Sequence, residues 1–354
     1  MKMYEGLTKF EETGTRVYIP EKKYSVDLSL TENPLKFSEK VLEVIEKEKF
    51  NVDHYPDPHH HDLRIALSEK FCIHKDSFIF GTGADGLIEN IIRILINKGE
   101  NVVMPELTFL NASFATIIAG GQVVFSKMKA DFHVDFEDLR GKIDEKTKII
   151  FICNPNNPTG VIESKDAIIN LIKSTDKIVV VDEANIEFGG VSVIDEVNKL
   201  DNLVVVRTFS KAYGLAGMRI GYCAGNKNLM YYIWRLRPPF TNTYLAQKTA
   251  REALKDERHI KKSKEYMIKE RNFLTKELTK RGFSVISSSA NCFLVKVTPL
   301  FESSTKFNEL LHQHDCTVVD GKYFRGLGDD YVRVAPRLHS INKKFIEIID
   351  KLLK

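Results

Sequence analysis

Five polar residues whose side chains can do chemistry stand at or just after short apolar runs. Asp182 ends the run IVVVD, Asn157 follows IIFIC, and Lys211 follows LVVVR. Arg219 lies eight residues beyond Lys211, and Arg333 stands in the later run YVRV. Such runs are typical of strands in a mainly parallel sheet, which binds ligands at the carboxyl ends of its strands. The positions therefore predict a ligand site, in which a buried Asp182 needs a partner for its charge.

The segment GTGADG at residues 81–86 follows another apolar run and precedes LIENIIRIL, which has the spacing of a helix. Glycines let the backbone approach a ligand, and free N–H groups at a helix start attract an anion, so the segment predicts a phosphate-binding turn. It also satisfies the pattern GxGxxG, and Glu106 follows about 20 residues later, where a dinucleotide-binding protein has an acid. A nicotinamide-dependent dehydrogenase that transfers hydride is therefore one alternative.

The elements that must position these residues are seven apolar runs rich in Val and Ile, separated by segments of helical spacing. The runs are FIF (78–80), NVVM (101–104), QVVF (122–125), IIFIC (149–153), IVVVD (178–182), LVVVR (203–207) and IGYCA (220–224). They predict an α/β fold with a mainly parallel, seven-stranded sheet in a large domain and helices on both faces of the sheet.

The pattern changes after Pro238 and Pro239. Residues 244–281 have the spacing of long helical sequence that ends before Gly282, and short strand and helix patterns follow to the end of the chain. We expect this part to form a smaller α+β domain. The predicted division is an N-terminal arm at residues 1–26, a large domain at 27–245 and a small C-terminal domain at 246–354.

The composition excludes several classes of function. The 354 residues are 43% hydrophobic and 28% charged, which is ordinary for a globular protein. The 52 basic and 48 acidic residues leave a net charge of +4, which is no signature of nucleic-acid binding. The polar start is no signal peptide, and no apolar run approaches a membrane span. An odd number of cysteines without a CxxC pair favours reduced thiols, so we expect a cytoplasmic protein.

Three consecutive histidines, His59 to His61, invite a metal interpretation. Adjacent residues on an irregular loop seldom converge on one ion, and no carboxylate or thiol spacing accompanies them. We therefore expect a polar loop here and no metal site.

Three motifs follow one another in an order that carries a family resemblance. They are NPNNPTG at residues 154–160, DEA at 182–184 and TFSKAYGLAGMRIGY at 208–222. Together they resemble the fold-type-I pyridoxal-phosphate enzymes of the class I/II aminotransferase group, and GLAGMRIGY with RLRPPF is most similar to the histidinol-phosphate aminotransferase branch. The resemblance implies a homodimer with shared active sites that binds pyridoxal 5′-phosphate. It would move an amino group between an amino acid or amino-phosphate compound and a 2-oxo acid.

The resemblance also implies a cofactor role for each matching residue. Lys211 matches the lysine that bonds the cofactor aldehyde and shuttles a proton. Asp182 matches the carboxylate that keeps the pyridine nitrogen protonated, and Asn157 matches the donor to the 3′ oxygen. Arg219 matches the cation that binds the cofactor phosphate. Further cofactor contacts are expected from Gly83, Ala84, Asp85, Phe109, Asn185, Thr208, Ser210 and Tyr55.

Other positions receive more specific expectations. Asp85 is expected to cap the start of a helix, since its charge would repel the phosphate. Tyr55 resembles the tyrosine that reaches the phosphate of the neighbouring subunit. For the substrate, Arg333 matches the arginine that binds the carboxylate, and Asn33 stands in an ENP segment that closes over the substrate. Tyr18 resembles the tyrosine of the arm that reaches across the dimer.

Three departures from the family pattern leave the substrate open. Asn185 replaces the tyrosine that follows DEA, and Phe109 replaces the tyrosine that stacks on the cofactor. Asp320 stands where the branch has a second arginine, so it would repel a substrate phosphate unless Lys322 or Arg325 takes over. A decarboxylase of a phosphorylated amino acid, similar to threonine-phosphate decarboxylase, is therefore a second alternative to transamination.

Overall fold

The computed structural model of the chain describes residues 22–354, and its largest element is a seven-stranded sheet. The strand order is β2-β8-β7-β6-β5-β3-β4. Strand β8 runs antiparallel to both neighbours, whereas the other four pairings are parallel, which confirms the predicted α/β fold. The seven predicted runs form β2 (Phe78–Gly81), β3 (Asn101–Pro105), β4 (Gln122–Ser126), β5 (Thr147–Cys153), β6 (Ile178–Asp182), β7 (Leu203–Thr208) and β8 (Gly221–Gly225).

The runs are apolar throughout because both faces of the sheet are buried. Along β6, Val179 and Val181 belong to one core, whereas Val180 belongs to the other. The first core is closed by α1 (Glu39–Glu48), α2 (His61–Phe71), α5 (Phe136–Gly141), α6 (Lys165–Lys173) and α8 (Tyr244–Leu254). The second is closed by α3 (Gly83–Leu95), α4 (Asn111–Ile118) and α7 (Lys227–Leu236). The sheet is therefore the middle of three layers, as its apolar runs predict.

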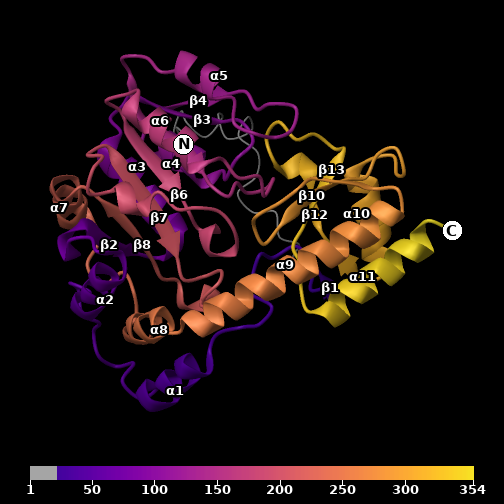
Figure 1. Ribbon diagram of the computed structural model, residues 1–354, viewed down its shortest axis with the longest axis horizontal. Helices are drawn as coiled ribbons and strands as arrows, with labels where there is room; N and C mark the ends of the chain where they lie inside the picture. The colour runs from indigo at the N-terminus through magenta and orange to yellow at the C-terminus, as the bar shows by residue number, and fades with distance from the viewer. Residues whose placement is uncertain (1–21) are drawn as a thin grey trace, which may run out of the picture.

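The C-terminal part holds a four-stranded antiparallel sheet in the order β12-β13-β10-β9. Its strands are β9 (Ser284–Val285), β10 (Phe293–Lys296), β12 (Val319–Asp320) and β13 (Tyr331–Val334). Helices α10 (Ser304–Gln313) and α11 (His339–Leu352) contribute to its core. The long helix α9 (Glu257–Lys280) runs from the edge of the large part to the C-terminal part and connects the two (Figure 1).

The predicted helical stretch at 244–281 is two helices. Helix α8 ends and α9 begins within three residues, because the Asp256 carboxylate accepts a hydrogen bond from the His259 N–H at 3.2 Å and caps α9. Gly282, at φ +88°, follows the end of α9 as expected. The break lets the chain leave the core of the large sheet and turn toward the C-terminal part.

The first described strand lies far from its sequence neighbours. Strand β1 (Val26–Asp27) pairs in parallel with β11 (Cys316–Thr317), and Val26 belongs to the core of the C-terminal part. The sequence assigned residue 27 to the large domain, whereas this segment packs with the C-terminal sheet. The division of the chain into two domains stays a prediction.

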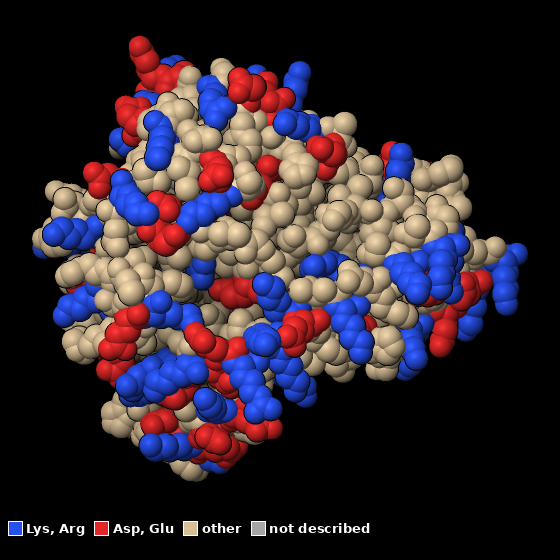
Figure 2. All heavy atoms as spheres, in the orientation of Figure 1, with Lys and Arg blue, Asp and Glu red and all other residues tan. Residues whose placement is uncertain are grey.

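The surface carries both signs of charge. Figure 2 shows basic and acidic side chains interspersed over the face in view, without a stripe of one sign. Across residues 22–354, no helix combines the length and the apolar character that a bilayer crossing needs.

A buried ion cluster fixes the ends of β6 and β7. The Arg207 guanidinium lies 2.9 Å from Glu183 and 3.4 Å from Glu187, and water reaches little of any of the three side chains. The Ser192 hydroxyl and the Val193 N–H also donate to Glu183. Burial raises the pKa of Glu187 to about 7, although Arg207 opposes the rise. Since Glu183 directly follows β6, the cluster anchors the strand end that carries Asp182.

We expect Arg207→Met to lower the free energy of unfolding by about 3–5 kcal/mol, because it leaves two buried carboxylates without their cation. Urea denaturation of the purified protein measures the change. Arg251→Met is the matched control, since Arg251 forms an exposed ion pair with Asp62 at 3.2 Å, and its loss should cost about 1 kcal/mol or less. Equal effects of the two substitutions would contradict this role for the cluster.

Candidate active site

A cavity of about 240 Å³ lies at the carboxyl ends of β5, β6 and β7, beside the start of α3. It brings together residues from six separate segments of the chain, and the ends of three strands are among them, as the strand-end positions predicted. Its lining is Leu30, Thr31, Glu32, Ala84, Asp85, Phe109, Cys153, Asn157, Asp182, Ala184, Asn185, Thr208, Ser210, Lys211, Ala216 and Arg219. Most of the residues with an expected cofactor role are therefore in one place.

Lys211 projects into this cavity from the turn after β7. Its Nζ donates to the Thr31 hydroxyl at 2.6 Å and to the Thr31 carbonyl at 3.1 Å. Gly214, at φ +73°, completes the turn and packs so closely on the Lys36 carbonyl that a side chain there would collide with it. The lysine amine is therefore held at a defined point between the large sheet and the segment that precedes α1.

Asp182 ends β6 at the bottom of the cavity and is buried. Burial raises the pKa of its carboxyl to about 7, and the Ala184 N–H, which donates at 3.0 Å, offsets the rise only in part. The Cys153 thiol lies 3.7 Å from the other carboxylate oxygen. A cation placed in the cavity beside Asp182 would remove this cost of burial, as a protonated ring nitrogen does.

The start of α3 and Arg219 form an anion-binding end. Gly83 has φ +75°, and a Cβ there would lie 2.9 Å from the Arg219 guanidinium, so only glycine lets the two approach. The hydroxyls of Thr208 and Ser210 lie 2.9 Å apart at the same end. Backbone N–H groups, hydroxyls and a guanidinium together are the groups that hold a phosphate.

Asp85 does not cap α3 in the predicted way. The helix begins at Gly83, so Asp85 lies in its first turn, where its carboxylate accepts a hydrogen bond from Asn111 at 2.7 Å. Its other oxygen lies 3.5 Å from the Arg219 guanidinium. The acid therefore orients the cation of the phosphate end and ties α3 to α4.

Asn157 and Arg333 are in direct contact. Arg333 is fully buried in β13, and its guanidinium donates to the Asn157 side-chain oxygen at 2.9 Å and to the Ser29 carbonyl at 2.7 Å. The guanidinium joins the C-terminal sheet to the loop after β5. Arg333 is absent from the lining of the cavity, although Asn157, its partner, is part of that lining.

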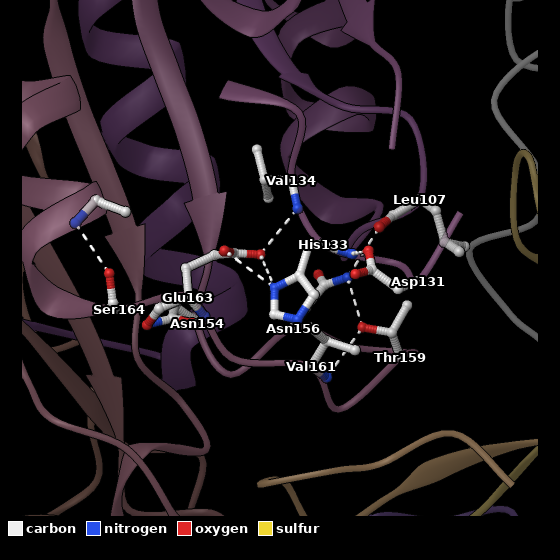
Figure 3. Close-up of polar contacts among 11 residues, drawn as sticks. Leu107, Asp131, His133, Val134, Asn154, Asn156, Thr159, Val161, Glu163 and Ser164 are labelled. Atoms are coloured by element: carbon white, nitrogen blue, oxygen red, sulfur yellow. Dashed lines mark hydrogen bonds and ion pairs between the residues drawn. The ribbon is translucent and has the colours of Figure 1, made fainter. Parts of the chain in front are cut away.

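A polar network holds the loop that carries Asn157 (Figure 3). The Asn156 amide donates to the Leu107 carbonyl at 2.9 Å and to Thr159 at 3.1 Å, and its oxygen accepts from Thr108 at 2.8 Å. Asn154 exchanges hydrogen bonds with the backbone of Glu163 on the same loop. The network fixes the distance between Asn157 and the segment 107–109, which presents Phe109 to the cavity.

Two further residues that were expected at the site, Asn33 and Tyr55, lie outside the lining of this cavity. The Asn33 amide donates to the Ala212 carbonyl at 2.8 Å and to Ser263 at 2.9 Å, so it is used in fastening the turn of Lys211 rather than in lining the cavity. Tyr55 is 82% exposed and lies against Phe240, outside the cavity. Tyr18 lies outside the described residues.

Asp320 does not line the cavity, so the expectation that it would repel a substrate phosphate there is wrong. Its carboxylate accepts hydrogen bonds from Ser304 at 2.5 Å and Thr305 at 2.7 Å, at the start of α10. Burial works to raise the pKa of Asp320, but these hydrogen bonds outweigh it and leave the pKa below its ordinary value. Lys322 pairs with Asp320 at 3.3 Å, and Arg325 stacks on Phe125 at 4.2 Å.

The histidine run is divided among local contacts. His60 is buried against Phe80 and hydrogen-bonded to Asn242 at 3.0 Å, and burial lowers its pKa to about 4. His59 stacks on Trp234. Within residues 22–354, no group of three His, Cys, Asp or Glu side chains is arranged to hold a metal ion.

Among the lining residues that the sequence did not assign to the site, two contact its central groups. Thr31, which bonds Lys211, directly precedes the ENP segment, so proximity to that motif was the available signal. Cys153 is the last residue of β5, next in sequence to NPNNPTG. Its contact with Asp182 depends on the register of β5 against β6, in which the two residues are paired.

The residues present fit pyridoxal phosphate. Asp182 is a buried carboxylate that needs a cation, and the Asn185 side-chain oxygen is buried without a hydrogen-bond partner among the described residues. The Gly83 turn and Arg219 suit a phosphate, and Phe109 lines the same cavity. Lys211 would hold the aldehyde, Asp182 the ring nitrogen and Arg219 the phosphate.

Comparisons with known proteins agree with this geometry. The family model for aminotransferase class I and II matches residues 25–347. The histidinol-phosphate aminotransferase of Methanococcus aeolicus is 37% identical over 93% of this chain and 90% of its own. The crystal structure of the Clostridium acetobutylicum histidinol-phosphate aminotransferase has a TM-score of 0.85 at 29% identity, over 92% of this chain and 98% of its own. The Sinorhizobium meliloti enzyme in complex with pyridoxal-5′-phosphate has the same fold, with a TM-score of 0.86 at 21% identity, over 94% of this chain and 92% of its own.

After removal of the cofactor, we expect the melting temperature of the wild type to fall relative to that of Asp182→Asn as the pH rises from about 4 to about 7. Over this range the folded protein keeps Asp182 protonated while the unfolded chain releases the proton, so folding becomes less favourable. Asp182→Asn should remove this contribution, because an amide does not titrate, while His60 contributes an opposite slope to both proteins. Calorimetry across this pH range measures both proteins. Glu187 adds the same slope to each, and an equally steep profile for the variant would contradict the assignment.

Proposed function

The chain belongs to the aminotransferase class I and II family, and from this premise we propose that its amino donor is histidinol phosphate and its acceptor is 2-oxoglutarate. The chain is a pyridoxal-phosphate-dependent aminotransferase. Its histidinol-phosphate relatives support this choice of amine, since they match almost the whole chain. The observation that carries the proposal is the convergence of Lys211, Asp182 and Arg219 on one cavity.

Each of the three residues has a separate task. When bound, pyridoxal phosphate draws electrons away from the carbon–hydrogen bond beside the substrate amine. The Lys211 amine would take the proton from that carbon and deliver it to the carbon of the cofactor. Thr31, 2.6 Å from Nζ, orients the amine for this transfer. The Asp182 carboxylate would stabilise a positive charge at the ring nitrogen, and Arg219 would hold the phosphate in place.

The dehydrogenase alternative does not account for this arrangement. Hydride transfer has no use for a lysine amine held in the same cavity as a buried carboxylate. The glycine segment packs against Arg219 at one end of the cavity. The aminotransferase family model matches residues 25–347, which include this segment. The decarboxylase alternative shares the cavity and is separated from transamination by the experiment below.

A homodimer in the cytoplasm is the setting we propose for the reaction. Tyr55 supports the dimer, because an aromatic side chain so exposed, beside the half-exposed Phe240, is suited to contact a second copy of the chain. All five cysteines are free thiols, which is typical of proteins in a reducing compartment. We propose that Arg333 binds the carboxylate of the amino-acid substrate.

Lys211→Ala should abolish amino transfer while leaving the fold intact, because it removes the proton-transferring amine and no core contact. We expect a fall in kcat of at least about 10³-fold. Quenched assays with histidinol phosphate measure the rate, and circular dichroism checks the fold. A variant that still exchanges amino groups at the normal rate would refute this role of Lys211.

A half-reaction assay tests the choice of substrate. The purified holoenzyme is mixed separately with histidinol phosphate, glutamate and threonine phosphate, while the absorption of the cofactor and the release of carbon dioxide are followed. We expect a rapid change of absorption with histidinol phosphate and with glutamate, without carbon dioxide. Release of carbon dioxide from threonine phosphate would instead establish a decarboxylase. No change with histidinol phosphate would reject it as the amine.

A further inference from the structure

The proposed function, on which this inference rests, brings two phosphates to the site. The cofactor phosphate takes Arg219 and the start of α3, which leaves the phosphate of the substrate to be bound elsewhere. A phosphate dianion is best held by a guanidinium, which donates two parallel hydrogen bonds to its oxygens. A second arginine beside the cavity would therefore suit the substrate phosphate.

A second cavity of about 380 Å³ adjoins the first and shares Glu32, Ser210 and Ala216 with it. Its lining includes Arg337, from the segment between β13 and α11. Among the residues that line either cavity in the described part of the chain, the arginines are Arg219 and Arg337. Because Arg219 is engaged by the cofactor and Arg333 is the group proposed for the substrate carboxylate, Arg337 is the lining guanidinium available to the substrate phosphate.

The position of Arg337 is fixed through its backbone. The Arg337 N–H donates to the Asn342 side chain at 2.9 Å, and the Asn342 amide donates back to the Arg337 carbonyl at 2.9 Å. Asn342 is itself anchored by a hydrogen bond of 2.9 Å to the buried Glu270. The start of the side chain is therefore rigid, which reduces the entropy that a ligand would have to overcome.

The charged end of Arg337 is already occupied by an anion. Its guanidinium lies 3.1 Å from the Glu32 carboxylate and 3.4 Å from the Leu30 carbonyl. The two side chains are 26% and 46% exposed, so the pair is open to solvent on the cavity side. An exposed pair of this kind is weak. A dianion with three acceptor oxygens can displace a single carboxylate from the guanidinium.

We propose that Arg337 binds the phosphate of the substrate and that Glu32 occupies this guanidinium until the substrate arrives. Lys322 and Arg325, the replacements considered from the sequence, are engaged with Asp320 and Phe125 and do not line either cavity. The exchange at Arg337 makes the enzyme selective for amines that carry a distal phosphate.

A purely structural role makes a different prediction. Arg337 and Glu32 also connect the C-terminal part to the segment that carries Thr31, so their pairing could serve only to close the site. In that case Arg337→Met would slow the reaction of phosphorylated and unphosphorylated amines equally. If the guanidinium binds the phosphate, the loss falls on the phosphorylated amine alone.

The first test compares histidinol phosphate with histidinol in the holoenzyme. Arg337→Met should raise KM for histidinol phosphate by about 10- to 100-fold and leave KM for histidinol unchanged. Glu32→Gln should lower KM for histidinol phosphate by about two- to fivefold, because the competing carboxylate is gone. Lys322→Met is the matched control, since it removes an equal charge outside both cavities. Equal changes for the two amines would overturn the proposal.

The second test separates this proposal from the choice of histidinol phosphate. Inorganic phosphate is titrated into the holoenzyme, and its affinity is read from the shift in melting temperature. Arg337→Met should weaken binding by about 10-fold or more, and Glu32→Gln should strengthen it. If the wild type does not use histidinol phosphate but Arg337→Met still loses phosphate binding, the function proposed above fails and the anion site stands. Phosphate affinity that is unaffected by Arg337→Met rejects the site.

Discussion

A carboxylate that is buried with no ion pair to any of the described residues is the constraint on which the rest of the site depends. Asp182 ends an apolar strand at the centre of the large sheet, and its neighbours supply one backbone N–H and a thiol but no positive charge within hydrogen-bonding distance among the described residues. Ionising such a group is unfavourable until a ligand brings the missing charge. The fold accepts this cost at one end of the cavity and arranges the phosphate-binding groups at the other. The ligand is thereby oriented by its two ends.

The residues around the site come from segments that are far apart in the sequence. The turn of Lys211 is held by Asn33, and its amine is held by Thr31. Arg333 reaches from the C-terminal sheet to Asn157 and to the backbone of Ser29. The segment before α1 is therefore in contact with both sheets. The position of the Lys211 amine therefore depends on the assembly of the large sheet, the C-terminal sheet and the segment before α1, because these contacts join them to one another.

The sequence revealed the large sheet and the cofactor residues for the same physical reason. Strands buried on both faces must be apolar, so they are easily recognised, and a polar residue at their ends is then conspicuous. Asp182 and Lys211 were found in this way. Asp320 was misplaced, because spacing locates a residue along the chain but not the direction of its side chain, which here turns to the start of α10. The pairing of β1 was not predictable, since two residues carry no periodicity.

That pairing has a consequence for how the protein is made. Ser25 and Asp315, which are hydrogen-bonded beside β1 and β11, are 290 positions apart. On the ribosome, the first strand emerges long before its partner has been translated. Val26 and Leu28, which end in the C-terminal core, must wait in water or against a chaperone while the large sheet forms. Completion of the C-terminal core is therefore a late event of biosynthesis, and it requires the closure of a loop that spans most of the chain.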